Sequence, residues 1–264
     1  MVNQISTSRP IILGIDTSGE YCSVGLVQGE KILGEISICA PREHSVQLIP
    51  SIDKILKENN LRIQQVDGIA VSIGPGCFTG LRVGVATAKA LAQGLNIPIV
   101  GVPTLDMIAL NAVDIVKGDS PHLHICPIVD ARKQQVYTAL YRYKIQDLRF
   151  KIKKLTKDLA VTVEELLTMH DQAEQSLPLQ CRMNATATVF IGNAIQIYGD
   201  KIKDKLGKQA IFAPQELWYP RASNVALTGT EQLRRKKRGD KLFKLKPIYV
   251  REPDIRAPKK PTSC

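Results

Sequence analysis

The amino-acid sequence predicts a mixed α/β protein in which one unit occurs twice. First, a buried strand over 11–15 meets Asp16 and turns straight back into a strand over 22–27. Second, the same pattern returns around Asp130, between apolar runs at 125–129 and 136–140. Third, strand and helix patterns alternate after each copy, which is typical of α/β domains. Repetition of a whole unit indicates a duplicated architecture, although two ordinary hairpins can also match by coincidence.

The remaining elements follow from hydrophobic periodicity and turn residues. Short apolar runs predict strands, and apolar residues at helical spacing predict helices, one of which has Pro50 near its start, where the proline limits or kinks the helix. These segments are strands at 31–38, 68–73 and 189–193, and helices at 45–59, 79–93 and 223–238, with another helix starting near Ala194. We therefore expect a first lobe at 1–110, a second lobe at 111–252 and a flexible basic tail at 253–264.

Length and composition exclude several classes of protein. The chain has 264 residues, 44% of them hydrophobic and 23% charged, which is ordinary for a globular protein of one large domain or two lobes. No apolar run approaches the roughly 18 residues of a membrane span, and the start lacks a secretory signal pattern. We expect a cytoplasmic protein without membrane contact. Six scattered cysteines without a C-x-x-C pair indicate neither a disulfide framework nor a zinc site.

Positive charge is concentrated in the second half of the chain. The net charge is +11, but residues 1–130 contribute −3 and residues 131–264 contribute +14. The densest run is Arg234, Arg235, Lys236, Lys237 and Arg238. Such a field attracts RNA or an acidic partner, whereas a solvated helix end or a loose tail explains the run equally well. Aromatic residues make up 5% of the chain without RNP-like spacing, which argues against a dedicated base-stacking sheet.

The aspartate at each turn is a candidate ligand for magnesium and nucleotide. A strand that ends in Asp-x-Ser/Thr and turns back is how actin, Hsp70 chaperones and sugar kinases meet phosphate, with the carboxylate holding magnesium through water. Asp16, Thr17 and Ser18 supply these groups at the first turn, and Asp130 at the second. The alternative is that the aspartate and serine only close the turn through local hydrogen bonds.

The segment 74–84, Gly-Pro-Gly-Cys-Phe-Thr-Gly-Leu-Arg-Val-Gly, is the most specific motif in the sequence. It lacks the Gly-Lys-Ser/Thr of a Walker A loop, and it predicts a sharp turn followed by a helix capped by Thr79. Gly80, Gly84 and Ala88 recur every four residues and form a smooth ridge where another backbone can approach. The helix is apolar around most of its circumference, so it is either enclosed in its own lobe or shared with a partner helix.

Motifs for nucleophilic and metal-dependent catalysis are missing from the sequence. No two of the four histidines have the i, i+4 spacing of a helical metal pair, and no H-E-x-x-H or G-x-S-x-G motif occurs. We therefore predict no catalytic residue and no metal site.

Taken together, these segments resemble the TsaB family, also called YeaZ. The resemblance is carried by Ile12–Ser18, His44–Ser45, the 74–84 motif, Asp130–Arg132 with Val136–Tyr137, and the closing Pro247–Arg251. It implies a duplicated actin-like ATPase (RNase H-like) fold. It also implies a partner of TsaD that works with TsaE to attach threonylcarbamoyl to N6 of the tRNA adenosine next to the anticodon.

The resemblance further implies a subunit without catalytic activity or a required cofactor. TsaD is similar in its Gly-Pro-Gly helix but has an H-x-x-x-H metal pair where this chain has the segment 104–108, Thr-Leu-Asp-Met-Ile. Family members pair through first-lobe helices, with TsaD or as free homodimers. The expected contact residues are Ile49, Ile52, Leu56, Gly80, Gly84, Thr87, Ala88 and Leu91. The basic run at 234–238 is the expected tRNA contact. The alternative is an ATP-dependent small-molecule kinase or ATPase with Asp16 and Asp130 as magnesium ligands.

Overall fold

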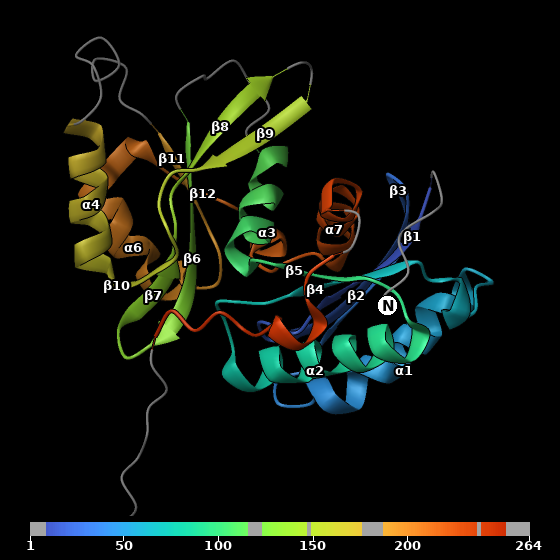
Figure 1. The fold of residues 1–264 in the computed structure, drawn as a ribbon. Helices are drawn as coiled ribbons and strands as arrows, with labels where there is room; N and C mark the ends of the chain where they lie inside the picture. Colours follow the sequence, from blue (N-terminus) through green and yellow to red (C-terminus); the bar gives the residue numbers. More distant parts are fainter. Residues whose placement is uncertain (1–8, 116–122, 147–148, 176–186, 237–238, 252–264) are drawn as a thin grey trace, which may run out of the picture.

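The computed structural model describes residues 9–115, 123–146, 149–175, 187–236 and 239–251. It confirms a mixed α/β fold with two sheets, one in each half of the chain (Figure 1). The predicted flexible tail at 253–264 lies outside the described residues.

The first sheet has the strand order β3-β2-β1-β4-β5. Its strands are β1 (Ile11–Asp16), β2 (Tyr21–Gln28), β3 (Lys31–Cys39), β4 (Gly68–Ser72) and β5 (Ile99–Val102). The first three strands are antiparallel neighbours, whereas β1, β4 and β5 run parallel. Helices α1 (His44–Glu58) and α2 (Phe78–Leu95) pack against each other and cover one face of this sheet (Figure 1). Pro50 lies inside α1.

The second sheet repeats this order as β10-β7-β6-β11-β12. Its strands are β6 (His124–Arg132), β7 (Gln135–Thr138), β10 (Leu159–Thr162), β11 (Thr188–Ile191) and β12 (Ala210–Phe212). Again three strands, β10, β7 and β6, are antiparallel neighbours, and β11 and β12 run parallel to β6. The matching order and direction show that the two sheets are copies, as in the duplicated actin-like fold. Strands β8 (Tyr141–Gln146) and β9 (Arg149–Lys154) form an added hairpin beside β6.

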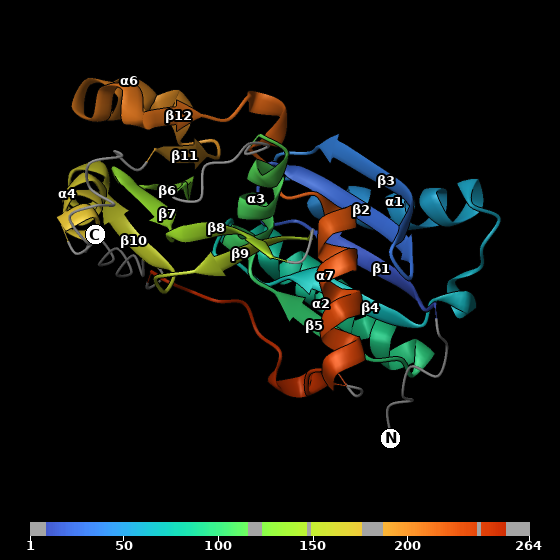
Figure 2. The same ribbon diagram turned by 90° about the horizontal axis from the view of Figure 1, so that it is seen from above.

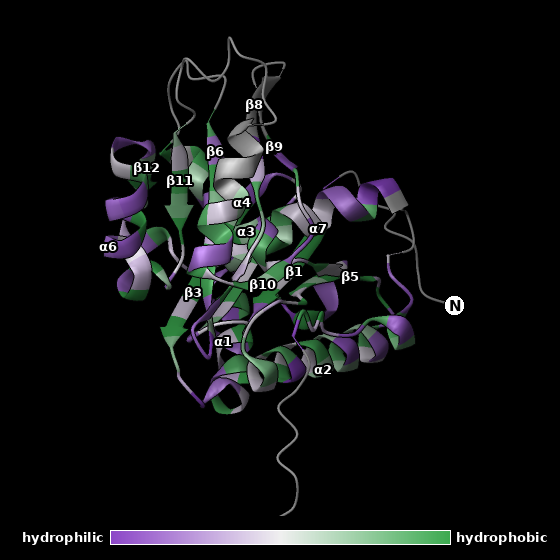
Figure 3. Ribbon diagram, turned by 90° about the vertical axis from the view of Figure 1, so that its left-hand side faces the viewer, coloured by the Kyte–Doolittle hydropathy of each residue, from purple (hydrophilic) through white to green (hydrophobic). Residues whose placement is uncertain are grey.

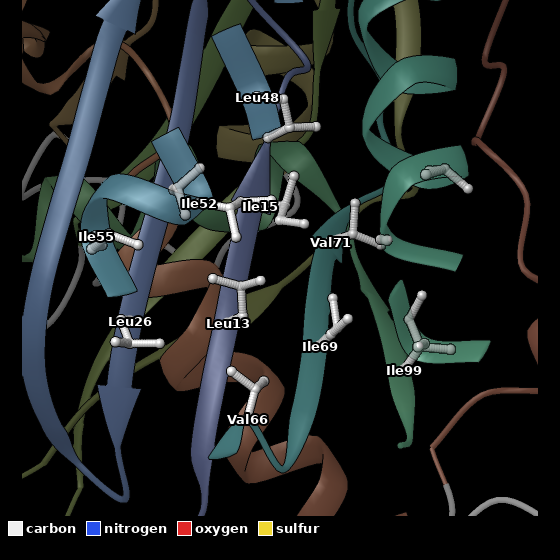
Figure 4. Packing of buried hydrophobic residues seen from close by; sticks show 14 of the residues in the cluster. Leu13, Ile15, Leu26, Leu48, Ile52, Ile55, Val66, Ile69, Val71 and Ile99 are labelled. Carbon is white, nitrogen blue, oxygen red and sulfur yellow. The ribbon is translucent and has the colours of Figure 1, made fainter. Parts of the chain in front are cut away.

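The parallel strands β1, β4 and β5 are buried on both faces, which explains why they are almost continuously apolar, whereas the edge strand β3 is largely exposed. Leu13 and Ile15 of β1 point to the side of α1, where Leu48, Ile52 and Ile55 meet them (Figure 4). Ile12, with the opposite pleat direction, belongs to a cluster on the other face of the sheet.

The other face of the first sheet is covered by α7 (Ala222–Lys236), which comes from the end of the chain (Figure 2). Gly14 and Gly25 allow this close approach, because a Cβ at either position would overlap the backbone of α7 at Ala222 and Ser223. Conversely, α3 (Thr104–Asn111) packs mainly into the core cluster of the second sheet. Each lobe therefore packs against a helix from the other half of the chain.

Helices α4 (Val163–Gln175) and α6 (Ile195–Leu206) complete the second lobe on the face opposite α3. In the hydropathy view, α6 is mostly hydrophilic along its length (Figure 3). None of the helices within the described ranges is both long and hydrophobic enough to cross a membrane.

Candidate functional site

A cleft of about 780 Å³ lies between the two aspartate turns. The first turn contributes Ser18 and Gly19, and the second contributes Asp130, Ala131 and Arg132. Other lining residues come from the two sheets, from α1, α2 and α6, from the segment before α7 and from the closing segment. They include His44, Cys77, Phe78, Asn193, Tyr219, Ile248, Tyr249 and Arg251. The two turns that the sequence paired as equivalent therefore face one common space.

At the first turn, the carboxylate of Asp16 is turned inward. It accepts hydrogen bonds from the Ser18 amide at 3.2 Å and from the Ser18 hydroxyl at 2.9 Å, and it is buried. Burial raises the pKa of Asp16 from its ordinary value of 3.8 to about 6, against the opposing effect of the Ser72 and Ser18 hydroxyls. This is the turn-closing arrangement that the sequence left open as the alternative to a magnesium ligand.

The glycine-rich motif holds this turn in place. The Cys77 amide donates a 2.7 Å hydrogen bond to the Ser18 carbonyl oxygen, and the Thr17 hydroxyl donates one of 2.8 Å to the Gly80 carbonyl oxygen. A side chain on Gly80 or on Gly84 would overlap Thr17. The residue that caps α2 is Cys77, without a side-chain hydrogen bond, so the prediction that Thr79 caps the helix is wrong.

At the second turn, the carboxylate of Asp130 binds Arg132 in the same turn. It accepts a 2.9 Å hydrogen bond from the Arg132 amide, and its other oxygen lies 3.3 Å from the Arg132 guanidinium. The Asp130 amide donates to the Asn193 side chain at the start of α6. Arg132, Lys133 and Gln134 all have positive φ, a backbone conformation that non-glycine residues rarely adopt.

Both carboxylates are engaged within their own turns. In the part of the chain that the structure describes, no group of three histidine, cysteine or acidic side chains is arranged to hold a metal ion.

The segment 104–108 serves packing and local charge pairing. The Thr104 hydroxyl oxygen accepts a hydrogen bond from the Gly74 amide, and Ile108 is buried in the core of the second lobe. Asp106 accepts a 2.6 Å hydrogen bond from the Tyr141 hydroxyl and a 2.8 Å hydrogen bond from Lys154. Burial, reinforced by the Asp106 carboxylate, raises the pKa of Tyr141. These contacts attach α3 to the β8–β9 hairpin.

Most of the predicted partner-contact residues face the inside of the first lobe. Gly80 and Gly84 lie against Thr17, so the smooth ridge receives the first turn of its own chain rather than another molecule. Ala88 is fully buried in the core beside the sheet. Ile52 and Leu56 of α1 are buried in the same cluster, and Thr87 and Leu91 are half-buried. The ridge is therefore not available to a partner helix.

The outer side of these helices exposes other residues. Ile49 was expected at the contact and is 53% exposed, and Val46, one turn earlier on α1, is 65% exposed. On α2, Ala86 and Ala90 are exposed at helical spacing, whereas Val83 packs against the core. We call the four residues Val46, Ile49, Ala86 and Ala90 the α1–α2 face. Apolar and polar segments alternate along both helices (Figure 3). Val46 was not among the expected contact residues, because hydrophobic periodicity does not show which apolar side chains of a helix stay exposed.

The basic run at the end of α7 is partly neutralised. Arg234 forms an ion pair with Glu30 at 3.5 Å, and Arg235 forms one with Glu231. Lys236 ends the helix, and residues 237–238 lie outside the described ranges.

The closing segment Pro247–Arg251 crosses from one lobe to the other. The Ile248 amide donates to the Ile73 carbonyl oxygen, and the Arg82 guanidinium on α2 donates a 3.1 Å hydrogen bond to the Tyr249 hydroxyl. The Arg251 guanidinium then donates to the Ala131 carbonyl oxygen in the second turn. The segment thus ties α2 to the opposite side of the cleft, a role that its sequence did not suggest.

Comparisons with known proteins agree with this architecture. The model of the family described as "TsaD: tRNA N6-adenosine threonylcarbamoyltransferase" matches residues 35–258. A Bacillus subtilis protein described as tRNA threonylcarbamoyladenosine biosynthesis protein TsaB is 30% identical over 221 residues, which cover 84% of this chain and 87% of that protein. The Escherichia coli protein of the same description is 34% identical over 131 residues, about half of either chain.

Solved structures support the fold alone. The structure described as YeaZ from Pseudomonas aeruginosa superimposes with a TM-score of 0.69 at 24% identity, covering 91% of this chain and 99% of that one.

Proposed function

Because this chain belongs to the TsaB family, with a role in the biosynthesis of threonylcarbamoyladenosine in tRNA, we propose that it is the non-catalytic partner subunit of TsaD. In this proposal it binds and activates TsaD, and the pair works with TsaE to attach threonylcarbamoyl to N6 of the adenosine next to the anticodon. The free chain forms a homodimer through the surface that TsaD uses, resides in the cytoplasm and requires no cofactor.

The observation that carries the partner role is the α1–α2 face. Val46 and Ile49 are large apolar side chains that stay exposed, whereas Leu48, Ile52 and Ile55 of the same helix are packed into the first lobe. Ala86 and Ala90 extend this surface with small side chains on the adjoining helix. An apolar surface with small side chains, formed by two packed helices, suits docking of a second helix pair.

The state of the two turns supports a subunit without catalytic activity. Asp16 is buried and hydrogen-bonded to Ser18, and Asp130 is paired with Arg132, so both carboxylates are used to hold their own turns. Thr104 and Ile108, at the positions compared with the metal pair of TsaD, hold a backbone amide and fill the core.

The test is reconstitution of the tRNA modification from TsaD, TsaE, ATP, threonine-derived donor and tRNA, with and without this chain. We expect modification to require this chain, and a Val46→Glu/Ile49→Glu double variant to fail both in binding TsaD and in supporting the reaction. Full modification without the chain, or with a variant that does not bind TsaD, would refute the partner role.

One observation favours the kinase or ATPase alternative, namely the interlobe cleft that both aspartate turns line. ATP turnover by the isolated chain distinguishes the two functions.

A further inference from the structure

We propose that a groove beside the closing segment binds single-stranded nucleic acid. The groove has a volume of about 780 Å³ and shares only Ile248 and Tyr249 with the lining of the interlobe cleft. Its lining residues are Ile73, Asp240, Lys241, Lys244, Leu245, Lys246, Pro247, Ile248 and Tyr249. We call this feature, with its apolar floor and its lysines, the basic groove.

Local structure explains why the lysines of the groove and the neighbouring Phe243 are exposed. The short 3₁₀ helix η5 (Leu242–Lys244) places residues three apart on one side. Leu245 is buried in the core of the first lobe, and Leu242 packs against the same core. Phe243, between these two anchors, is 85% exposed. Because its two neighbours are anchored in the core, the Phe243 ring stays in solvent, where a ligand can contact it.

The charge of the groove is not neutralised by the protein. Lys241, Lys244 and Lys246 are exposed, and within the described ranges none has an acidic side chain at ion-pair distance. The acidic residue in the lining is Asp240, whose carboxylate accepts a 2.9 Å hydrogen bond from the Gly101 amide. By contrast, Arg234 and Arg235 on α7 have carboxylate partners. Among the described residues from 234 to 246, the lysines of this groove therefore carry positive charge that no carboxylate pairs at ion-pair distance.

The combination of lysines, an exposed phenyl ring and an apolar floor indicates the chemistry of the ligand. Phosphates neutralise lysines, whereas bases stack on aromatic rings. Tyr249, which is 42% exposed, supplies the aromatic ring in the lining itself, and the exposed Phe243 lies beside the groove, next to the lining residue Lys244 in the chain. A duplex keeps its bases stacked inside, so the ligand that satisfies both features is a strand with unpaired bases. We assign RNA as the ligand, and this choice of RNA over DNA rests on the proposed function.

The binding test uses the isolated chain and a fluorescein-labelled 12-mer of uridine, followed by anisotropy at several salt concentrations. The groove variant is Lys241→Gln/Lys244→Gln/Lys246→Gln. Its matched control, Lys203→Gln/Lys205→Gln/Lys208→Gln, removes the same charge from exposed lysines on and just after α6. We expect the groove variant to lose at least tenfold in affinity, and its slope of log affinity against log salt to fall by about 2. Equal losses in both variants would show a diffuse field and overturn the site.

Phe243→Ala tests stacking, with Ile32→Ala on β3 as the control for loss of an exposed apolar side chain. We expect Phe243→Ala to weaken binding of the 12-mer about fivefold or more and to leave binding of an RNA duplex unchanged. An unchanged affinity for the 12-mer, or equal wild-type affinities for strand and duplex, would contradict the proposal.

Two further probes separate the sources of the ligand. Equal binding of a deoxythymidine 12-mer supports shared recognition of bases and phosphates, whereas binding of the DNA without the RNA would overturn the assignment to RNA. Binding to phosphatidylglycerol vesicles without binding to either oligonucleotide would show a membrane contact instead. Because no TsaD is present, these results are independent of the reconstitution: a chain that binds RNA but is dispensable for tRNA modification refutes only the proposed function.

Discussion

The hydroxyl of Thr17 donates its hydrogen bond to the carbonyl oxygen of Gly80, which joins the first turn to α2 across 63 positions of the sequence. The same threonine fills the space above Gly84. The spacing of small residues on α2 thus follows the shape of a turn in the same lobe.

Gly84→Ala is expected to destabilise the protein by about 1–3 kcal/mol, because the new methyl group would overlap the Thr17 side chain. Urea unfolding measures the loss. Gly94→Ala is the control, since Gly94 lies on the same helix with open space around it, and alanine there is expected to stabilise by roughly 0.5–1 kcal/mol. Combining Gly84→Ala with Thr17→Ala is expected to recover part of the loss. Equal stability of the two glycine variants would contradict the close contact.

Asp16→Asn is expected to change how stability depends on pH. The folded pKa of Asp16, about 6, lies above its ordinary value of 3.8, so between these values the folded state holds a proton that the unfolded state has lost. The ionised carboxylate therefore costs folding free energy that is absent below pH 4 and complete above pH 6, up to about 3 kcal/mol.

The measurement is the free energy of unfolding of wild type and Asp16→Asn at several pH values between 4 and 8. We expect the wild type to lose stability relative to the variant as pH rises through 6. A difference that is flat over this range, or that changes in the opposite direction, would rule out a raised pKa.

Val46→Glu/Ile49→Glu is expected to abolish homodimerisation and TsaD binding while leaving the monomer folded, because both side chains are exposed in the free chain. Light scattering and co-purification measure assembly, and thermal unfolding checks the fold. Ile32→Glu, at an exposed apolar residue on β3, is expected to assemble normally. Ala88→Glu, in contrast, is expected to unfold the chain, since it would bury an unpaired carboxylate. Normal assembly of the double variant would exclude the α1–α2 face.

The isolated chain is expected not to turn over ATP, because Asp16 and Asp130 are both held within their turns. Phosphate release in the presence of magnesium is the measurement, with Asp16→Asn beside the wild type. Turnover in the wild type that disappears in the variant would support the kinase or ATPase function and count against the partner role.

Local pattern predicted most of the elements, and long-range packing explains the errors. The apolar alternation around Asp16 and Asp130 predicted both strand-turn-strand units, because a short turn leaves few ways to pair neighbouring strands. The helix at 223–238 was also predicted, but its periodicity does not say which sheet it covers. Gly80 and Gly84 were correctly identified as sites of close approach. Spacing alone, however, could not distinguish a partner helix from Thr17, which the fold brings there from the first turn.

Placement of α7 over β1 and β2 also affects how the protein is synthesised. The amino-terminal half emerges from the ribosome first, yet one side of its sheet stays bare until residues 222–236 have been translated. During that interval the apolar surface around Ile12 and Val27 is open to water and to other nascent chains. Chaperone dependence of expression is therefore expected to increase sharply in any truncation that ends before Ala222.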